Sequence, residues 1–249
     1  MFKFFKGIRR RLLKEGKLKN YLLYAFGEII LVVLGILIAL QINKWNIGRV
    51  EKKEEIAILK GIIEDILRDT IDMNYNMGVY KYSIKMDSTL LNNLTEIKQY
   101  DSEITWSLFA YYTNGLNLIL HQSYFEEAKS RGLKIISNSE LRKEISRLYE
   151  FHYISLLKSE NENDGLLMDS YDQYLKDNKL IQALPSQDDF GLFLPKDKYQ
   201  QLVNDEHFHF LLKLKLEISG AMLNSKYNPV HQRALELVEK IEEELERLE

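Results

Sequence analysis

Residues 21–45 of the chain read YLLYAFGEIILVVLGILIALQINKW, and this stretch decides what kind of protein the sequence describes. Between Tyr21 and Leu40 it holds one charged residue, Glu28, and residues 29–40 are all apolar or glycine. A helix of about twenty residues spans the roughly 30 Å hydrocarbon core of a bilayer. We therefore predict a transmembrane helix over residues 21–45.

Two other interpretations of this stretch are less favoured. A buried helix of a soluble domain shows a polar face, and residues 29–40 show none. A cleaved signal peptide has an apolar core of about 7–15 residues followed by small residues. The residues Ala39-Leu40-Gln41 fit that cleavage pattern poorly. An uncleaved signal-anchor is therefore the better interpretation.

The charges indicate how the helix is oriented. The net charge of −3 and the mean hydropathy of −0.29 are averages over unlike parts. Residues 1–20 carry eight Lys or Arg and one acid, a charge of +7, and the rest of the chain carries −10. Lys and Arg are enriched on the cytoplasmic flank of a span. We therefore place the N-terminus in the cytoplasm and the C-terminal part in the periplasm, on a bacterial inner (plasma) membrane.

Both flanks of the span hold residues typical of a membrane interface. Arg9, Arg10 and Arg11 lie in a basic amphipathic segment suited to an anionic cytoplasmic leaflet. The aromatic residues Tyr21, Tyr24 and Trp45 stand where an interfacial belt places them. A basic arm of twenty residues with no fold of its own does not favour nucleic-acid binding, so we expect the lipid bilayer as the partner.

One face of the span gathers an acid, small residues and an amide. At about 100° per residue, Gly35, Ala39 and Asn46 fall within about 20° of Glu28. Small residues four apart let helices approach closely, and a carboxylate within a span is a functional-site hypothesis by default. We predict that this face, Glu28, Gly35, Ala39 and Asn46, associates with a second copy or with another membrane protein.

A simpler interpretation of Glu28 stays open. If the span is shifted towards residues 26–45, Glu28 lies near the inner headgroups, where Lys17 or Lys19 neutralises it. In that case the acid anchors the helix at the interface and takes no part in association.

The residues after Trp45 predict helices almost throughout. Positions 56, 59, 63, 66, 70, 73, 77, 80, 84, 87, 91 and 94 are apolar or aromatic except Thr70 and Asp87, a heptad-like seam. Flanking apolar residues widen it, which suits a helix bundle better than a two-stranded coiled coil. The same phase runs back into the span, and no proline precedes Pro185. We predict one helix that continues from the membrane as a stalk.

Further helices and one loop complete an all-α fold. Amphipathic patterns predict helices over 102–120, 122–131, 139–158, 165–177, 204–224 and 229–248, with a loop over 182–197. Gly132 predicts a helix end, Asn138 or Ser139 a helix cap, and Pro229 a helix start. The expected organisation is a cytoplasmic arm (1–20), a transmembrane helix (21–45) and an extracytoplasmic helical bundle (46–249).

Little in the sequence points to catalysis or to a cofactor. The absence of cysteine excludes a disulfide framework, a thiolate zinc site and a cysteine nucleophile. No phosphate loop, nucleophile elbow or zincin motif is present. His207 and His209 are two residues apart, and on a helix such residues point away from each other. We expect no enzyme, no metal and no cofactor.

Charged and aromatic residues of the outer part are expected to be structural. Glu54-Glu55 and Glu242–Glu244 are predicted to be solvated helix faces. The fifteen tyrosines are predicted to pack in the bundle with their hydroxyl groups reaching water, although they could instead line a ligand groove. His121, His152 and His231 are isolated in the sequence, and His152 is expected to be packed or at a boundary.

Residues 27–46, GEIILVVLGILIALQINKWN, follow a basic stretch that begins MFKFF. Together they resemble a family of bacterial membrane proteins of unknown function that carries a Gly-Glu-Ile…Gly-Ile-Leu-Ile-Ala-Leu-Gln-Ile-Asn-x-Trp-Asn signature. The resemblance covers residues 1–46 and is thin beyond them, as over Glu140–Ser146. It implies a single N-terminal span and a helical outer domain, and it implies no known enzymatic activity.

These observations lead to two functional hypotheses. The first is a non-enzymatic, single-pass envelope protein that self-associates and acts as a scaffold or interaction module. The second is a ligand sensor whose bundle passes a signal through the continuous helix to a partner, because only about twenty residues lie inside the cell. A deep pocket lined by tyrosines would favour the sensor, and a closed core would disfavour it.

Overall fold

The computed structural model describes residues 18–101, 118–163, 169–180, 194 and 196–249. Every regular element in these ranges is a helix, which confirms the predicted all-α fold. The chain divides into two compact units, Met1–Glu54 and Glu55–Glu249. The helix expected over 102–120 lies outside the described residues except for 118–120, which are not helical.

Helix α2 (Leu18–Asn92) is a single α-helix of 75 residues that contributes to both units. The predicted continuation of the apolar helix beyond residue 45 as one helix is therefore confirmed. A short π-helical turn, η1 (Asn93–Ile97), follows it directly. Lys98 then takes a left-handed backbone conformation with a φ of 51°, which ends the helix.

The predicted seam of α2 forms the core of the second unit. Among the seam positions, Leu59, Ile66 and Met73 have no exposed surface, and the others described there are buried or partly buried. Each large apolar side chain removed from water contributes about 1.5–3 kcal/mol. The seam therefore fixes which face of α2 the other helices cover.

A second long helical segment carries one π-helical turn in its middle. It consists of α6 (Ser139–Arg147), η3 (Leu148–Tyr153) and α7 (Ile154–Asn163), without a break. The Asn138 side chain caps α6 by accepting hydrogen bonds from the backbone N–H groups of Glu140 and Leu141. The predicted helix over 139–158 is confirmed and extends further.

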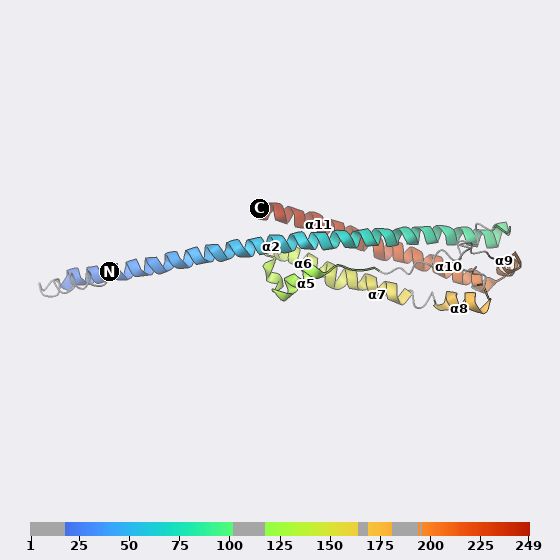
Figure 1. The fold of residues 1–249 in the computed structure, drawn as a ribbon, viewed down its shortest axis with the longest axis horizontal. Coiled ribbons are helices and arrows are strands. Elements are labelled where there is room, and N and C mark those ends of the chain that lie inside the picture. Colours follow the sequence, from blue (N-terminus) through green and yellow to red (C-terminus); the bar gives the residue numbers. More distant parts are fainter. Residues whose placement is uncertain (1–17, 102–117, 164–168, 181–193, 195) are drawn as a thin grey trace, which may run out of the picture. The chain divides into compact units, whose positions relative to one another are not determined.

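The last segment corrects the sequence-based expectation of two separate helices. Helix α10 (Glu206–Ala221), the π-helical turn η6 (Met222–Tyr227) and α11 (Asn228–Leu248) follow one another without interruption. Asp205 caps α10 by accepting a hydrogen bond from Phe208. Pro229 stands in the first turn of α11, where its missing N–H is harmless, so it does not break the segment. Figure 1 shows α10 leading directly into α11.

Short helices complete the second unit. They are α5 (Ser123–Ser130), the 3-10 turn η2 (Leu133–Ile135), α8 (Asp169–Asp177) and α9 (Lys196–Val203). Gly132 follows α5 with a φ of 86°, which confirms the predicted helix end. Helix α9 was not predicted, because its first residues were assigned to a loop over 182–197. The rest of that loop, apart from Leu194, lies outside the described residues.

The core of the second unit has two parts along α2. The larger cluster joins residues 58–80 of α2 to α5, to the α6–η3–α7 segment and to α11. The smaller cluster joins Leu90 and Leu94 to α8, α9 and α10. Helix α2 is therefore the element that both clusters share.

Candidate functional site

The part of α2 from Leu22 to Val50 presents apolar side chains outward. All large apolar residues described between Leu22 and Val50 are exposed, and the most apolar window of the helix is not buried at all. A soluble helix of this hydropathy buries one face. Among the described residues, α2 is the one helix long and apolar enough to cross a membrane.

The four residues of the predicted association face all lie on this part of α2. Glu28, Gly35, Ala39 and Asn46 are exposed. A Cβ atom added at Gly35 would meet no atom of the described chain within 4 Å. The helix therefore leaves the face open, and its association with another helix stays a prediction.

The predicted interface residues are only partly described. Arg9, Arg10 and Arg11 lie outside the described residues, and Tyr21 lies in the first turn of α2. Trp45 is 67% exposed, and the Arg49 guanidinium lies 5.6 Å from the centre of its ring. This cation–π contact leaves the indole available to an interface.

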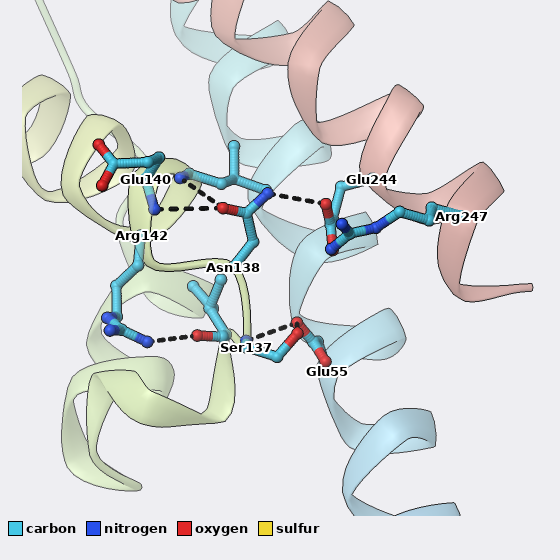
Figure 2. Close-up of polar contacts among 9 residues, drawn as sticks. Glu55, Ser137, Asn138, Glu140, Arg142, Glu244 and Arg247 are labelled. Carbon is cyan, nitrogen blue, oxygen red and sulfur yellow. Dashed lines mark hydrogen bonds and ion pairs between the residues drawn. The ribbon is translucent and has the colours of Figure 1, made fainter.

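A connecting segment, residues 136–138, holds the start of the second unit together. Glu55, the first residue of that unit, is buried, and its carboxylate accepts hydrogen bonds from the Ser137 N–H at 2.7 Å and the Ser137 hydroxyl at 2.8 Å. Arg142 donates to the Ile136 carbonyl oxygen at 2.6 Å. Figure 2 shows Glu55 facing Ser137 across these contacts. The prediction that Glu55 lies on a solvated face is wrong.

The next residue of this segment binds the end of the last helix. Asn138 donates from Nδ2 to Glu244 of α11 at 2.8 Å, while its side-chain oxygen caps α6. Arg247 forms an ion pair with the same carboxylate (Figure 2). Glu244 is buried, so the prediction of a solvated face is wrong for this residue as well.

Two carboxylates of α2 hold the beginning of α5. Asp65 accepts a hydrogen bond from the Tyr124 N–H at 3.1 Å, and Asp69 accepts one from the His121 N–H at 2.7 Å. The His121 ring lies 3.0 Å from the same Asp69 oxygen. Free N–H groups at a helix start favour a negative charge. His121, isolated in the sequence, therefore contacts a buried carboxylate of α2 while its own ring stays partly exposed.

The negative charge of Asp69 is disfavoured by burial. Burial raises the pKa of its carboxyl group to about 6, although the hydrogen bonds from His121 lower it. The Tyr153 hydroxyl group also lies close enough to Asp69 to lower the pKa of its carboxyl group, and the Tyr149 hydroxyl group is buried without a hydrogen-bond partner in the described residues. Burial and the negative charge of Asp69 raise the pKa of both tyrosines.

A tyrosine in the last π-helical turn connects three helical segments. Asn76 of α2 donates to the Tyr227 hydroxyl at 2.9 Å, and this hydroxyl donates to the Glu160 carboxylate of α7. The Tyr80 ring lies 5.6 Å from the Tyr227 ring. The tyrosines of the core thus pack as predicted, but the expectation that their hydroxyl groups reach water is wrong for Tyr149, Tyr153 and Tyr227.

A buried ion pair lies further along α2. Lys215 of α10 lies 3.0 Å from Asp87, and each side chain is 1% exposed. The Ser83 hydroxyl donates a hydrogen bond to Asp87 at 3.0 Å. The Lys215 ammonium lies 5.1 Å from the centre of the Tyr171 ring. Burial raises the pKa of Asp87 and lowers that of Lys215. The polar residue of the predicted seam at position 87 is therefore paired with a charge that the sequence pattern did not identify.

The two histidines considered for a metal take separate roles. The His209 ring lies 2.9 Å from the Leu202 carbonyl oxygen, and the His207 ring packs 5.8 Å from the Tyr174 ring. No group of three side chains able to hold a metal ion occurs in the described ranges.

Over the residues that the structure describes, the protein is all-helical and has one helix long and apolar enough to cross a membrane. The chain belongs to the DUF6090 family of unknown function, whose model matches residues 28–214. The matched range begins within the apolar part of α2 and ends within α10. No curated protein and no solved structure matches the chain.

Proposed function

We propose that this chain is a single-pass membrane-anchored interaction protein of the bacterial envelope, in which α2 is the anchor and residues 55–249 form an extracytoplasmic assembly module. The observation that carries the proposal is the outward-facing apolar part of α2, which belongs to the same helix as the core seam of the module. The +7 charge of residues 1–20 supports a cytoplasmic N-terminus. No catalytic step is part of this function.

The association face of α2 gives the protein a way to self-associate. Gly35 and Ala39 allow a second helix to approach, and Glu28 and Asn46 offer hydrogen bonds where few alternatives exist. In this arrangement the anchor brings copies of the module together. The scaffold is therefore an oligomer assembled through its membrane helix.

The test is chemical crosslinking of the full chain in membranes, comparing Gly35→Leu with Gly48→Leu. Both glycines are exposed with no described atom within 4 Å, so neither change disturbs packing inside the chain. At about 100° per residue Gly48 lies far round the helix from Gly35. We expect Gly35→Leu to lose the crosslinked oligomer and Gly48→Leu to keep it.

An oligomer of unchanged size in Gly35→Leu would contradict self-association through this face. Loss of the oligomer in both variants would show a general effect of leucine in the helix. This result would also contradict self-association through the face that contains Gly35. The amount of each variant in the membrane fraction controls for failure of insertion.

The alternative function, a ligand sensor, gains no support from the tyrosines. Tyr149, Tyr153 and Tyr227 have at most 2% of their surface exposed, so these rings fill the core and do not line a pocket. We therefore place the interaction module first.

A further inference from the structure

A groove of about 860 Å³ lies on the second unit between the α6–η3 segment and α11. Leu148 and Leu237, which are buried, are among the residues that line it, and the two segments contact each other. Pockets that hold small molecules have volumes of about 300–1,000 Å³. The groove thus has a suitable size, and its chemistry depends on the charged residues that line it.

The acids of the groove already have partners. Glu144 forms an ion pair with Lys240 at 2.5 Å, and Glu150 forms one with Lys129 at 3.5 Å. Glu236 accepts a hydrogen bond from Gln232 at 2.8 Å. None of these carboxylates pairs with the two arginines that line the same groove.

Arg147 of α6 and Arg233 of α11 have no hydrogen bond or ion pair from their side chains to any described residue. Both lie close enough to the half-buried His152 that their charges, after burial, lower its pKa. Arg147, Arg233 and His152 therefore line the same groove, with the two guanidinium groups coming from different helices. Two positive charges on one groove favour the binding of an anion there.

An apolar surface stands beside these charges. Phe151 is 64% exposed, and its ring meets the His152 ring edge-on at 5.2 Å between centres. Both residues belong to the π-helical turn η3, and such turns occur frequently at functional sites. The groove therefore offers an aromatic face next to two cations that form no ion pair within the described residues.

We propose that this groove binds a small soluble organic anion, whose carboxylate or phosphate group is held by Arg147 and Arg233 and whose apolar part lies against Phe151. Guanidinium groups match the geometry of carboxylate and phosphate oxygens and form charge-assisted hydrogen bonds to them. This binding site is separate from the membrane anchor and from the association face, so its test does not depend on the proposed function.

The test is a titration of the full chain, in nanodiscs of zwitterionic lipid, with phenyl phosphate as the probe. The histidine ring resonances are followed by NMR, and His152→Gln identifies the resonance of His152. We expect this resonance to shift and saturate with a dissociation constant in the range of about 0.1–10 mM. The affinity should be at least about tenfold weaker in Arg147→Gln/Arg233→Gln.

The matched control is Arg68→Gln/Lys213→Gln, which removes two exposed cations elsewhere on the second unit and should keep the wild-type affinity. Arg147→Lys/Arg233→Lys keeps both charges and should retain more affinity than the glutamine pair. Circular dichroism of each variant checks that the helices are intact, and all these substitutions are at exposed positions.

Three results would overturn the inference. They are a His152 resonance that does not move at about 10 mM probe, equal affinity in the wild type and the glutamine pair, and equal affinity for the neutral probe benzyl alcohol. Nanodiscs containing phosphatidylglycerol test the source of the anion. A shift of His152 caused by this lipid alone would contradict a soluble ligand, and its absence supports one.

Discussion

Asp69 shows how one buried side chain makes the stability of the unit depend on pH. Its carboxyl group has no exposed surface, and burial raises its pKa from 3.8 to about 6. Between these two values the folded state binds more protons at Asp69 than the unfolded state does. The contribution of Asp69 to stability is therefore present below about pH 4 and is lost as the pH rises through about 6.

We predict that replacing Asp69 by Asn removes this pH dependence. Compared with Asp69→Asn, the wild type should lose about 1 kcal/mol of unfolding free energy when the pH is raised from about 5 to 7.5. Urea unfolding of the full chain in nonionic detergent, at both pH values, measures the difference. His121, Tyr149, Tyr153 and Asp65 face this carboxylate and are the same in both proteins.

Asp72→Asn is the matched control, because Asp72 lies one turn further along α2 and is partly exposed. Its difference from the wild type should stay constant over the same range. If Asp69→Asn and the wild type change in parallel with pH, Asp69 does not carry the effect.

At this scale the sequence could predict which residues are apolar and buried, but not which charges are. Glu55 and Glu244 stand in runs of charged residues that look solvated, and Asp87 is one polar position in an apolar seam. Their partners, Ser137, Asn138 and Lys215, are more than eighty residues away or on another helix. Local patterns contain no information on such pairings, because a buried charge is decided by what the fold brings to it.

At the scale of elements, α2 and α5 meet at a glycine. A Cβ atom added at Gly61 would lie 2.2 Å from ring atoms of Tyr124, so the absence of a side chain there allows the close approach. Gly78 lies on the same helix, exposed, and an added Cβ would meet no described atom within 4 Å. The same substitution therefore tests close packing at Gly61 and helix propensity alone at Gly78.

We predict opposite effects of the same substitution at these positions. Gly61→Ala should destabilise the unit by about 1–3 kcal/mol, because the Tyr124 ring must shift. Gly78→Ala should stabilise it by about 0.5–1 kcal/mol, because alanine favours a helix interior. Thermal unfolding of the full chain, followed by circular dichroism, distinguishes them. Equal melting temperatures of the two variants would contradict the close contact of α2 with α5.

The helices themselves were predictable where caps and spacing agree. Neighbouring residues in the sequence determine the Asn138 cap, the helix end at Gly132 and the apolar seam of α2. The π-helical turns were not predictable in the same way. In η6 the buried residues Leu223 and Tyr227 are four positions apart, as in an ordinary α-helix, so the apolar spacing does not distinguish a π-helical turn.

At the scale of the whole molecule, the absence of cysteine allows the orientation of the chain in the membrane to be measured. The chain has no cysteine, so a single introduced cysteine is the one reactive thiol. Lys6→Cys marks the basic arm, and Lys213→Cys marks an exposed position on α10. Labelling with a membrane-impermeant maleimide then reports the side of the membrane.

We predict that Lys213→Cys is labelled in intact spheroplasts and that Lys6→Cys is labelled only after lysis, because positive flanks stay in the cytoplasm. The cysteine-free chain is the blank, and labelling in detergent confirms that both thiols can react. The reverse pattern, or protection of both thiols until lysis, would contradict a periplasmic module.

The Tyr227 hydroxyl also has a mechanical consequence for the second unit. Asn76 on α2 donates to it and Glu160 on α7 accepts from it, so one oxygen atom joins three segments in both directions. A slide of α2 by one residue, about 1.5 Å, would stretch the hydrogen bond from Asn76 to the Tyr227 hydroxyl, and both side chains are buried. We therefore expect residues 55–249 to resist sliding of α2 within the unit. A force along α2 should move these residues together as one rigid unit, or unfold them.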